Sequence, residues 1–473
     1  MRAVLQNGDA GVCIVGSGPA GSTLATRLAQ LGHDVCLIER AAFPRGHLGE
    51  SLSPGVLSLL ESTGVRNTVE AAGFRRVRTV QVNWDKGLAE RLDPAERGLL
   101  VDRGHFDRLL LERARAVGVR VLQPATVRET RWREGGFSLF VDTNGRRVEI
   151  RSAFLADASG RSDGRRARRR IDGKRTLALY AYWNGTNLPD QPRIEAGPDE
   201  WYWGVPLPDG TYNTLVFVDL DQYRAARSAA LVDRFRTLIA RSGLLDGCRN
   251  AQLAGPVRTT EATPYLALES VASQSIKIGD AALAIDPLSS SGVQKALQTA
   301  LAGAVVVNTL VRRPESREAA LRFYRTSIEN AATRHCGWAA DHYATVAAHR
   351  GGSFWHDRSA GRPDPPPPAV ARAGTHPSSD GSVELSPRLE FVDLPCLDGD
   401  FVTVKPAICH PALDDPLAYL GGFELAPLLR TVTAGMTPRE VARAWSAQVP
   451  LPDGSKMVGW LLTKGILVPR TRY

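Results

Sequence analysis

The sequence lacks the features that mark several common classes of protein. No apolar run approaches the ~20 residues of a membrane-spanning helix, so we expect no membrane partner. The first strand is expected from about Gly11, which leaves no signal-peptide layout before it. The six cysteines are scattered without a C-x-x-C pair, which argues against an encoded metal or redox centre. These absences favour a reduced, cytoplasmic protein with no metal site.

Lysine is scarce and arginine is abundant in this chain of 473 residues. Only seven of its 59 basic residues are lysines, and the formal net charge is +9. The densest basic cluster is "RSDGRRARRR", residues 161–170. It is either a solvated surface loop or a surface for an anionic partner, because charge alone attracts acidic molecules of many kinds. No nucleic-acid-binding motif accompanies it, so we expect no nucleic-acid partner.

The order of the expected elements predicts an α/β fold with a Rossmann-like core. Up to about residue 350, buried strands alternate with helices, which is typical of a doubly wound sheet. The predicted strands are 12–16, 34–39, 152–159 and 275–285, and the predicted helices are 21–32, 106–118 and 292–311. Residues 74–100 and about 174–260 instead alternate apolar and polar residues between turn signals. They predict an antiparallel sheet over the nucleotide layer.

The predicted domain boundaries follow from these patterns. Residues 1–350 are expected to form a domain built on the doubly wound sheet, into which an antiparallel domain is inserted. The segments of the doubly wound part are 10–75, 101–173 and 261–350, and the inserted segments are 76–100 and 174–260. Residues 351–390 are rich in Gly, Pro and Ser and predict a linker. Residues 391–473 predict a small C-terminal domain, in which Thr437 caps a helix that starts at Pro438.

The run "GVCIVGSGPAGSTLATRLAQLGHDVCLIER", residues 11–40, carries a dinucleotide-binding pattern. Its glycines have the G-x-G-x-x-G spacing between a strand and a helix. That spacing allows a tight turn, a close approach of the backbone to a diphosphate, and close packing of the helix on the strand. Glu39 ends the second strand, where its carboxylate can accept a hydrogen bond from a ribose hydroxyl. The predicted nucleotide-binding residues of this run are Gly16, Ser17, Gly18, Pro19, Ala20, Gly21, Glu39 and Arg40.

A second segment distinguishes FAD from NAD. "IKIGDAALAIDPLSSSGVQKALQTA", residues 276–300, places a Gly-Asp pair after a strand and a Ser/Gly loop before a long helix. It resembles the second FAD motif of flavin-dependent monooxygenases and halogenases. The resemblance implies that Asp280 binds a ribityl hydroxyl. It also implies that Gly292 and Val293, beyond Pro287, offer backbone N–H groups to the isoalloxazine, where the helix dipole would stabilise negative charge on reduced flavin.

Other segments resemble the same family. "FPRGHLGESLSPG", residues 43–55, is similar to its loop beside the flavin, which implies positions near the cofactor for Arg45, Glu50 and Ser51. "LADASGRSD", residues 155–163, is similar to its aspartate-glycine segment. The remaining implied cofactor contacts are Arg103 in "VDRGHFDRLLLERA" and Val127 in "ATVRET".

"WYWGVPLPDG", residues 201–210, fits the W-x-W-x-[IV]-P signature of flavin-dependent halogenases. Trp201 and Trp203 are either core packing or a wall between the flavin and a substrate pocket. Two other halogenase groups have no counterpart. The position of the pocket lysine is taken by Arg76, which stays protonated and cannot act as a nucleophilic amine, and that of the neighbouring glutamate by Ser289. The resemblance therefore favours oxygen insertion over halogenation.

The expected activity is that of an FAD-dependent monooxygenase. The resemblance implies that reduced flavin and O2 give a C4a-hydroperoxide, whose distal oxygen is attacked by an electron-rich aromatic ring. Removal of a ring proton needs an acceptor, and the residues leave the choice between Glu50 and His47 open. NAD(P)H is expected to reduce the flavin directly or through a separate flavin reductase. Three alternatives stay open: halogenation of a free or carrier-bound aromatic, isoprenoid saturation of the geranylgeranyl-reductase kind, and a flavin-containing chaperone.

The tail loosely resembles the PqqD-like winged-helix domains, which hold leader peptides at a sheet edge. The matching residues are Thr437–Ala442, Leu461, Gly465, Ile466, Leu467 and Val468. A plain structural module is the alternative. With a halogenase-like core that lacks the halogen groups, the tail resembles flavoproteins of the QhpG and LodB type. Those proteins hydroxylate a tryptophan inside a partner polypeptide during tryptophylquinone formation, which implies a peptide or protein partner such as a quinoprotein subunit.

Overall fold

The computed structural model describes residues 9–92, 98–133, 135–163, 168–171, 173–225, 230–360 and 381–470. The chain divides into two compact units. The first comprises Met1–Arg312 and Tyr324–Pro363, and the second comprises Arg313–Phe323 and Asp364–Tyr473. Over the described residues, no helix is both long and apolar enough to cross a bilayer.

The first unit contains the Rossmann-like sheet that the sequence predicts. Its parallel strands lie in the order β21 (Ser275–Lys277), β11 (Arg146–Asp157), β1 (Ala10–Val15), β2 (Val35–Ile38) and β8 (Arg120–Leu122). The antiparallel strands β9 (Ala125–Arg133) and β10 (Gly136–Thr143) extend it beyond β11. The strand predicted over 275–285 is wrong as a single element. A 3-10 turn, η3 (Gly279–Ala281), separates β21 from β22 (Leu283–Ala284), because Gly279 adopts a positive φ of 60°.

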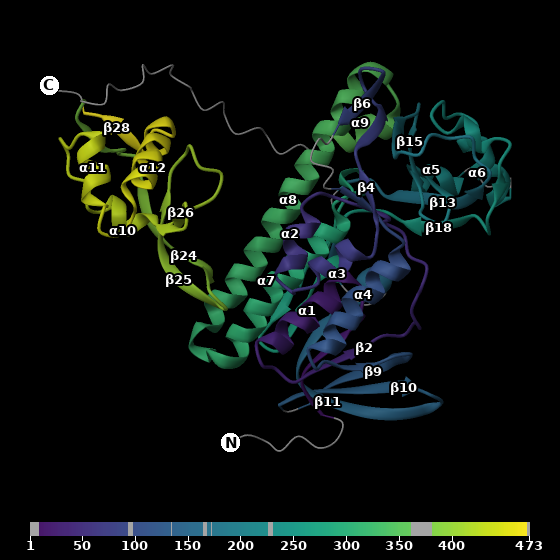
Figure 1. The fold of residues 1–473 in the computed structure, drawn as a ribbon, viewed down its shortest axis with the longest axis horizontal. Helices are drawn as coiled ribbons and strands as arrows, with labels where there is room; N and C mark the ends of the chain where they lie inside the picture. Colours follow the sequence, from purple (N-terminus) through teal and green to yellow (C-terminus); the bar gives the residue numbers. More distant parts are fainter. Residues whose placement is uncertain are drawn as a thin grey trace. The chain divides into compact units, whose positions relative to one another are not determined.

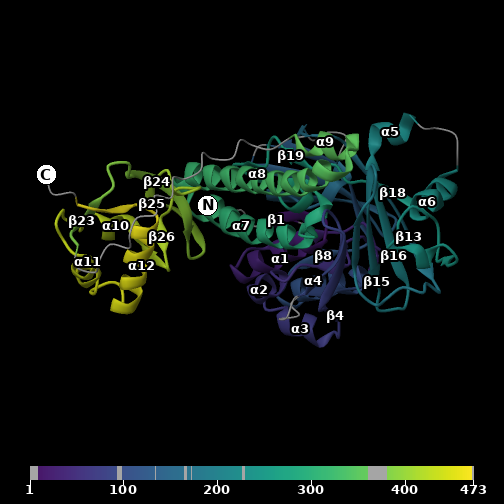
Figure 2. The same ribbon diagram turned by 90° about the horizontal axis from the view of Figure 1, so that it is seen from above.

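The three predicted helices are present as α1 (Pro19–Gln30), α4 (Arg103–Ala116) and α7 (Gly292–Arg312). α1 and α7 pack side by side (Figure 2). A Cβ on Gly303 of α7 would meet side-chain carbons of Ile278 at 3.1 Å and of Leu24 at 3.9 Å. The middle of α7 therefore lies close to the sheet and to α1.

A mostly antiparallel sheet forms the other part of the first unit (Figure 1). Its order is β17 (Gln252–Leu253), β13 (Thr176–Asn184), β16 (Tyr212–Asp219), β15 (Glu200–Pro206), β14 (Arg193–Ala196), β5 (Thr79–Asn83) and β6 (Leu88–Leu92). β18 (Arg258–Glu261) also pairs with β13. Within the predicted insertion 76–100, β5 and β6 join this sheet, whereas β7 (Gly98–Leu100) pairs with β3 (Ser51–Leu52) and β4 (Arg75–Val77).

The two faces of this sheet pack differently because side chains alternate along each strand. One face carries Trp183, Tyr202 and Val216 and packs with Phe235 of α6 (Leu231–Ile239). The opposite face carries Trp201, Leu215 and Phe217 in one cluster with Leu48 and Leu288. Those two leucines belong to the predicted flavin-binding loops. The second face is therefore the one that looks toward the candidate cofactor site.

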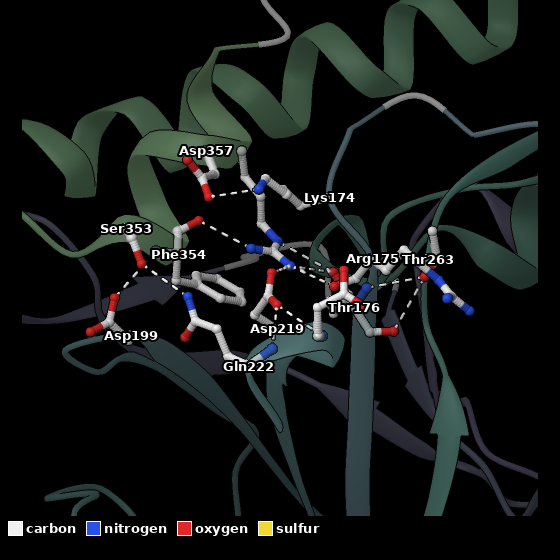
Figure 3. A network of polar contacts seen from close by, with 12 residues as sticks. Lys174, Arg175, Thr176, Asp199, Asp219, Gln222, Thr263, Ser353, Phe354 and Asp357 are labelled. Carbon is white, nitrogen blue, oxygen red and sulfur yellow. Dashed lines mark hydrogen bonds and ion pairs between the residues drawn. The ribbon is translucent and has the colours of Figure 1, made fainter. Parts of the chain in front are cut away.

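The first part of the linker predicted over 351–390 is wrong. Residues 353–359 form helix α9 (Ser353–Ser359), in which Phe354 and Trp355 are buried. Figure 3 shows why this segment is ordered: polar side chains of the antiparallel sheet reach α9. Arg358 contacts Asp219 at 3.3 Å and Thr176 Oγ1 at 3.1 Å. Residues 361–380 of the predicted linker lie outside the described residues. Its last residues are also not linker, because Val383–Leu385 form β23 and Glu390 begins β24.

The second unit has a core of its own. It contains α10 (Leu425–Leu429), α11 (Pro438–Ala444), α12 (Leu451–Thr463), the paired strands β23 (Val383–Leu385) and β28 (Leu467–Pro469), and the hairpin of β24 (Glu390–Asp398) and β25 (Phe401–Cys409). Its helices enclose Trp445, Met457 and Leu461. The predicted cap of α11 is present, since Thr437 and Glu440 form a reciprocal capping box.

Candidate active site

The turn between β1 and α1 has the geometry that the glycine spacing predicts. Gly16 has a φ of 99°, and a Cβ on it would lie 2.5 Å from the carbonyl oxygen of Ala158. A Cβ on Gly21 would overlap the carbonyl oxygen of Gly16. At Gly18, by contrast, a Cβ would meet the Arg45 guanidinium at 3.6 Å. The first and third glycines are thus required by the fold, whereas the second leaves space beside a cation.

Glu39 lies directly after β2 and holds the turn in place. Its Oε2 accepts hydrogen bonds from the backbone N–H and the hydroxyl of Ser17, at 2.8 and 3.0 Å. Its Oε1 accepts from the N–H of Ala41 at 2.8 Å. Glu39 is buried, with 4% of its surface exposed. Its hydrogen bonds from Ser17 place the carboxylate beside the backbone that would hold the diphosphate. Arg40, the next residue, is exposed.

One charged cluster lies beside this turn and consists of Arg45, Arg103 and Asp107; we call it the Asp107 cluster. The Asp107 side chain is fully buried and contacts Arg103 Nε at 3.0 Å and Arg45 Nη2 at 3.6 Å. Arg103 also donates to the Leu48 carbonyl oxygen at 2.6 Å. Two cations therefore share one carboxylate. The Nε of Arg45 is buried and has no acceptor among the described residues.

A second cluster of two basic residues and one aspartate consists of Arg161, Asp280 and Lys295; we call it the Asp280 cluster. Lys295 of α7 contacts Asp280 Oδ1 at 2.6 Å, and Arg161 Nε lies 3.4 Å from Oδ2. Burial opposes ionisation of Asp280, but the charges of Lys295 and Arg161 lower its pKa to about 2. The sequence predicted Asp280 and missed both cations. A lone lysine in the otherwise apolar start of α7 was the available signal.

The loop before α7 is shaped by Asp286. Its carboxylate accepts from the Leu288 N–H at 2.9 Å and from the Tyr343 hydroxyl at 3.0 and 2.9 Å. Burial raises the pKa of Asp286. Pro287 then opens a 3-10 turn that ends at Ser290, a non-glycine residue with a φ of 49°. Such a conformation costs on the order of 1 kcal/mol and tends to occur at functional sites. It leads directly into the N-terminus of α7 at Gly292 and Val293.

Glu50 joins the predicted flavin loop to the antiparallel sheet. Its Oε1 accepts from the Tyr182 hydroxyl at 2.9 Å and from the Asn213 amide at 3.0 Å. Its Oε2 accepts from the Gly49 N–H at 2.9 Å. Burial raises the pKa of Glu50. Tyr182 and Asn213 are direct partners on β13 and β16, so one carboxylate oxygen spans two strands. The sequence did not predict either partner, because both lie more than 130 residues away.

His47, Ser51 and Val127 occupy three different environments. His47 is exposed, and its Nδ1 lies 2.8 Å from the Leu48 carbonyl oxygen. Ser51 is half-buried in β3. Val127 is half-buried in β9 and packs on the edge of the Rossmann core. Of the two proton acceptors that the sequence proposed, Glu50 is the one that is buried and contacts the antiparallel sheet.

The two tryptophans of the W-x-W motif lie on the face of the sheet that looks toward the flavin loops. Trp201 is 1% exposed and stacks on Phe217, with ring centroids 3.7 Å apart. Trp203 is half-buried against the same cluster. Trp203 pairs with Leu215, one step along the face from Asn213. Trp201 is therefore core packing, and Trp203 is the member of the pair that can contact a guest.

The two positions at which halogenases carry reacting groups are occupied differently. Arg76 lies on β4 and contacts Glu70 Oε1 at 3.1 Å. Ser289 lies in the loop before α7, where its hydroxyl donates to the Asp286 carbonyl oxygen at 3.3 Å. An ion-paired guanidinium cannot replace a nucleophilic amine.

A cavity of about 130 Å³ adjoins the loop before α7. Its walls include Tyr265, Leu283, Asp286, Ala339 and Tyr343. An engineered cavity of about 150 Å³ is large enough for benzene, so this one has the size of a single aromatic ring. Asp286 and Tyr343 form part of its wall, so the cavity lies next to the loop before α7.

These residues fit FAD. The N-terminus of α1 has no side-chain cap, and its N–H groups can donate hydrogen bonds to a diphosphate. The unpartnered Nε of Arg45 and the open space at Gly18 lie on the same side of the turn. The Asp107 cluster and the Asp280 cluster each carry one net positive charge, which matches the two negative charges of a diphosphate. The isoalloxazine would lie at the N-terminus of α7, and Asp280 would reach the ribityl chain.

Comparisons with known proteins agree with this geometry. Residues 9–203 match the family model described as FAD binding domain. The chain is 30% identical over 366 residues to a tryptophan 2-halogenase of Chondromyces crocatus, covering 73% of this chain and 69% of that protein. The fold is similar to that of the flavin-dependent halogenase CmlS, with a TM-score of 0.78 and 21% identity over 98% of this chain and 96% of that one. It is also similar to the peptidyl tryptophan dihydroxylase QhpG, which is essential for tryptophylquinone cofactor biogenesis, with a TM-score of 0.75 and 27% identity over 97% of this chain and 99% of that one.

Proposed function

This chain belongs to the FAD-binding flavoproteins of the halogenase family, which are FAD-dependent oxidoreductases, and from that premise we propose that it hydroxylates an aromatic side chain of a peptide or protein. The observation that carries oxygen insertion over halogenation is Arg76. At the position where the resemblance implies a reacting lysine, this chain has a guanidinium that is ion-paired with Glu70. The whole-length likeness to a peptidyl tryptophan dihydroxylase supports tryptophan as the residue modified.

The protein's own residues have three tasks in this proposal. FAD, when bound and reduced, supplies the activation of O2, so that one oxygen atom enters the ring and the other leaves as water. Trp203 and the apolar face around Leu215 position the ring and exclude water. Glu50 is the final acceptor of the proton released from the ring. Tyr182 relays it, because its hydroxyl donates to the buried Glu50 carboxylate at 2.9 Å and its oxygen can take up the ring proton as it gives its own to Glu50. Electrons come from NAD(P)H, either directly or through a flavin reductase.

The proposed partner is a polypeptide that undergoes tryptophylquinone maturation, such as a quinoprotein subunit. The net charge of +9 favours an acidic one. The second unit is proposed to hold that partner through its sheet edge, as the resemblance to leader-peptide-binding domains implies. A cytoplasmic location belongs to the same proposal and rests on the six scattered cysteines.

The test supplies purified FAD-loaded protein with reductant, O2 and tryptophan-containing peptides, with free tryptophan as the comparison. We expect a mass gain of one or two oxygen atoms on the peptide and none on free tryptophan. Glu50→Gln and Tyr182→Phe should each lower the rate by on the order of 100-fold or more while the protein stays yellow. A peptide that stays unmodified would contradict the proposed function. A rate that neither substitution changes would contradict the proton relay.

Halogenation is the second candidate, because a tryptophan 2-halogenase is 30% identical to this chain. The same assay decides between them when bromide or chloride is added. A brominated or chlorinated product in place of the oxygenated one would replace our proposal with halogenation. Substitution of Arg76 by lysine sharpens the result, since a gain of halogenated product on Arg76→Lys would identify the missing amine as the cause of the difference.

A further inference from the structure

Lys295 is a buried charged residue near the start of α7. It is the fourth residue of α7, its side chain is 2% exposed, and its neighbours Ala296 and Leu297 are buried. Burying an ammonium group costs several kcal/mol unless it is paired and hydrogen-bonded. Lys295 donates to Asp280 Oδ1 at 2.6 Å and to the Leu283 carbonyl oxygen. The chain therefore retains a buried cation that is paired with one carboxylate and one carbonyl oxygen.

The position of Asp280 places this cation beside the proposed cofactor. A Cβ on Gly279 would lie 2.8 Å from the Cβ of Ala20, so η3 touches the first turn of α1. On its other side, the Gly279 N–H donates to the Thr299 hydroxyl of α7 at 2.9 Å. Asp280 thus lies between the helix that would bind the diphosphate and the helix that would face the isoalloxazine. Lys295 approaches it from the second of these helices.

The charges of the Asp280 cluster do not cancel. Asp280 is ionised at neutral pH, because its pKa is about 2, and Arg161 stays protonated. Burial lowers the pKa of Lys295, and its contact with the Asp280 carboxylate opposes that shift. In the protonated form of Lys295, which donates to Asp280 Oδ1 at 2.6 Å, the cluster carries one net positive charge. If Lys295 were apolar, the cluster would be neutral. The identity of residue 295 therefore sets the local charge by one unit without altering the surface of the protein.

We infer that Lys295 is a positioning residue that holds Asp280 toward the cofactor and whose charge makes the site favour reduced, more negative FAD over oxidised FAD. The inference rests on FAD binding at this site, and not on which product the enzyme makes. A neutral ion pair between Lys295 and Asp280 would only hold α7 and η3 together. A net positive charge additionally stabilises the form of the cofactor that carries more negative charge.

The test is a series of variants with known cluster charge, assayed without any aromatic substrate. Asp280→Asn raises the net charge by one, Lys295→Met lowers it by one, and the double variant restores the value of the unmodified protein. The dissociation constants of oxidised and reduced FAD are measured for each, together with the midpoint potential of the bound flavin. We expect the ratio of reduced to oxidised dissociation constants to rise by on the order of tenfold in Lys295→Met, which is about 30 mV lower for a two-electron couple.

The opposite shift is expected in Asp280→Asn, and a potential close to that of the unmodified protein in the double variant. If both single variants shift the potential in the same direction, or if neither shifts it, the inference is wrong and the pair is structural only. Lys456→Met is the matched control, because Lys456 is 80% exposed in the second unit. The midpoint potential of the flavin bound to this variant should equal that of the unmodified protein. Should Lys295→Met fail to fold, Asp280→Asn and the double variant still differ by one charge and must differ in potential. Failure of peptide hydroxylation with the expected shifts intact would count against the proposed function alone.

Discussion

The two compact units bury different kinds of residue. The first buries many charged side chains, among them Glu39, Glu50, Arg103, Asp107, Asp219, Asp286, Lys295 and Arg358. In the second unit, the buried polar residues among the described positions are Ser386 and His410, and burial lowers the pKa of His410, which favours its neutral form. Buried charges rarely add stability by themselves. The first unit therefore gives up stability to hold charged groups at the candidate site, whereas the second is packed as an ordinary apolar core.

The largest expected effect is that of Asp107→Ala. The substitution leaves the buried Arg103 without its carboxylate, and an arginine cannot release its proton to escape the cost. We expect the free energy of unfolding of the cofactor-free protein to fall by about 3–5 kcal/mol, measured by urea denaturation. Asp453→Ala removes the partner of the exposed Lys456 in the second unit and should cost less than about 1 kcal/mol. Equal losses of unfolding free energy in Asp107→Ala and Asp453→Ala would contradict the difference between the two units.

The next effect concerns binding rather than stability. Gly18 has a φ of −65°, which alanine adopts freely, but a Cβ there would fill the space left for the diphosphate. Gly18→Ala should weaken FAD binding by on the order of 100-fold, about 2.7 kcal/mol, with an unchanged unfolding curve for the cofactor-free protein. Gly459→Ala, in the exposed face of α12 where a Cβ meets nothing within 4 Å, should raise stability by roughly 0.5–1 kcal/mol and leave FAD binding as it is. Titration of flavin fluorescence measures the affinities.

Two glutamates should give opposite pH dependences. Burial raises the pKa of Glu50 above its ordinary value, so its contribution to stability is present at low pH and is lost as the pH rises through the raised pKa. Compared with Glu50→Gln, the unmodified protein should therefore lose stability as the pH rises above the ordinary glutamate pKa of about 4, by about 1.4 kcal/mol for each unit of pKa difference.

Glu440 of the second unit provides the matched case. Hydrogen bonds from Thr437 lower the pKa of Glu440, so its stabilising contribution is present at neutral pH and is lost as the pH falls through the lowered pKa. Relative to Glu440→Gln, the unmodified protein should lose stability on acidification. Thermal unfolding at a series of pH values measures both differences. If the stability difference between unmodified protein and variant changed with pH in the same direction for both glutamates, the pKa shifts of the two carboxyl groups would not be opposite.

The smallest expected effect is that of Thr437→Ala. It removes the side chain that caps α11 and should cost about 1 kcal/mol of stability. FAD affinity should not change, because the substitution is confined to the second unit. A loss of FAD binding in this variant would show that the cofactor site depends on the second unit.

Much of the fold and the glycine turn could be predicted from the sequence because both depend on local patterns. Gly16, Gly18 and Gly21 lie within six residues, and the alternation of strands and helices is legible along the chain. The partners of Glu50 and Asp280 could not be predicted in this way. Tyr182 and Asn213 reach Glu50 only because β13 and β16 are brought over the loop by the fold.

The two wrong expectations have similar causes. The strand over 275–285 was inferred from its apolar residues, but the positive φ of Gly279 interrupts the backbone. The linker over 351–390 was inferred from its composition. α9 is ordered by a long-range contact, because Arg358 has its carboxylate partner, Asp219, at the end of β16. Composition alone carries no information about such a pairing.

The single oxygen of Glu50 that bonds both Tyr182 and Asn213 has a practical consequence for redesign. Substitution of Tyr182 or Asn213 will alter this anchor and with it the loop that carries Glu50. Broader substrate acceptance should therefore be sought at Trp203, whose strand β15 supplies neither of the two hydrogen bonds to that carboxylate. Libraries directed there would change the face proposed to position the aromatic ring and leave the link between loop and sheet in place.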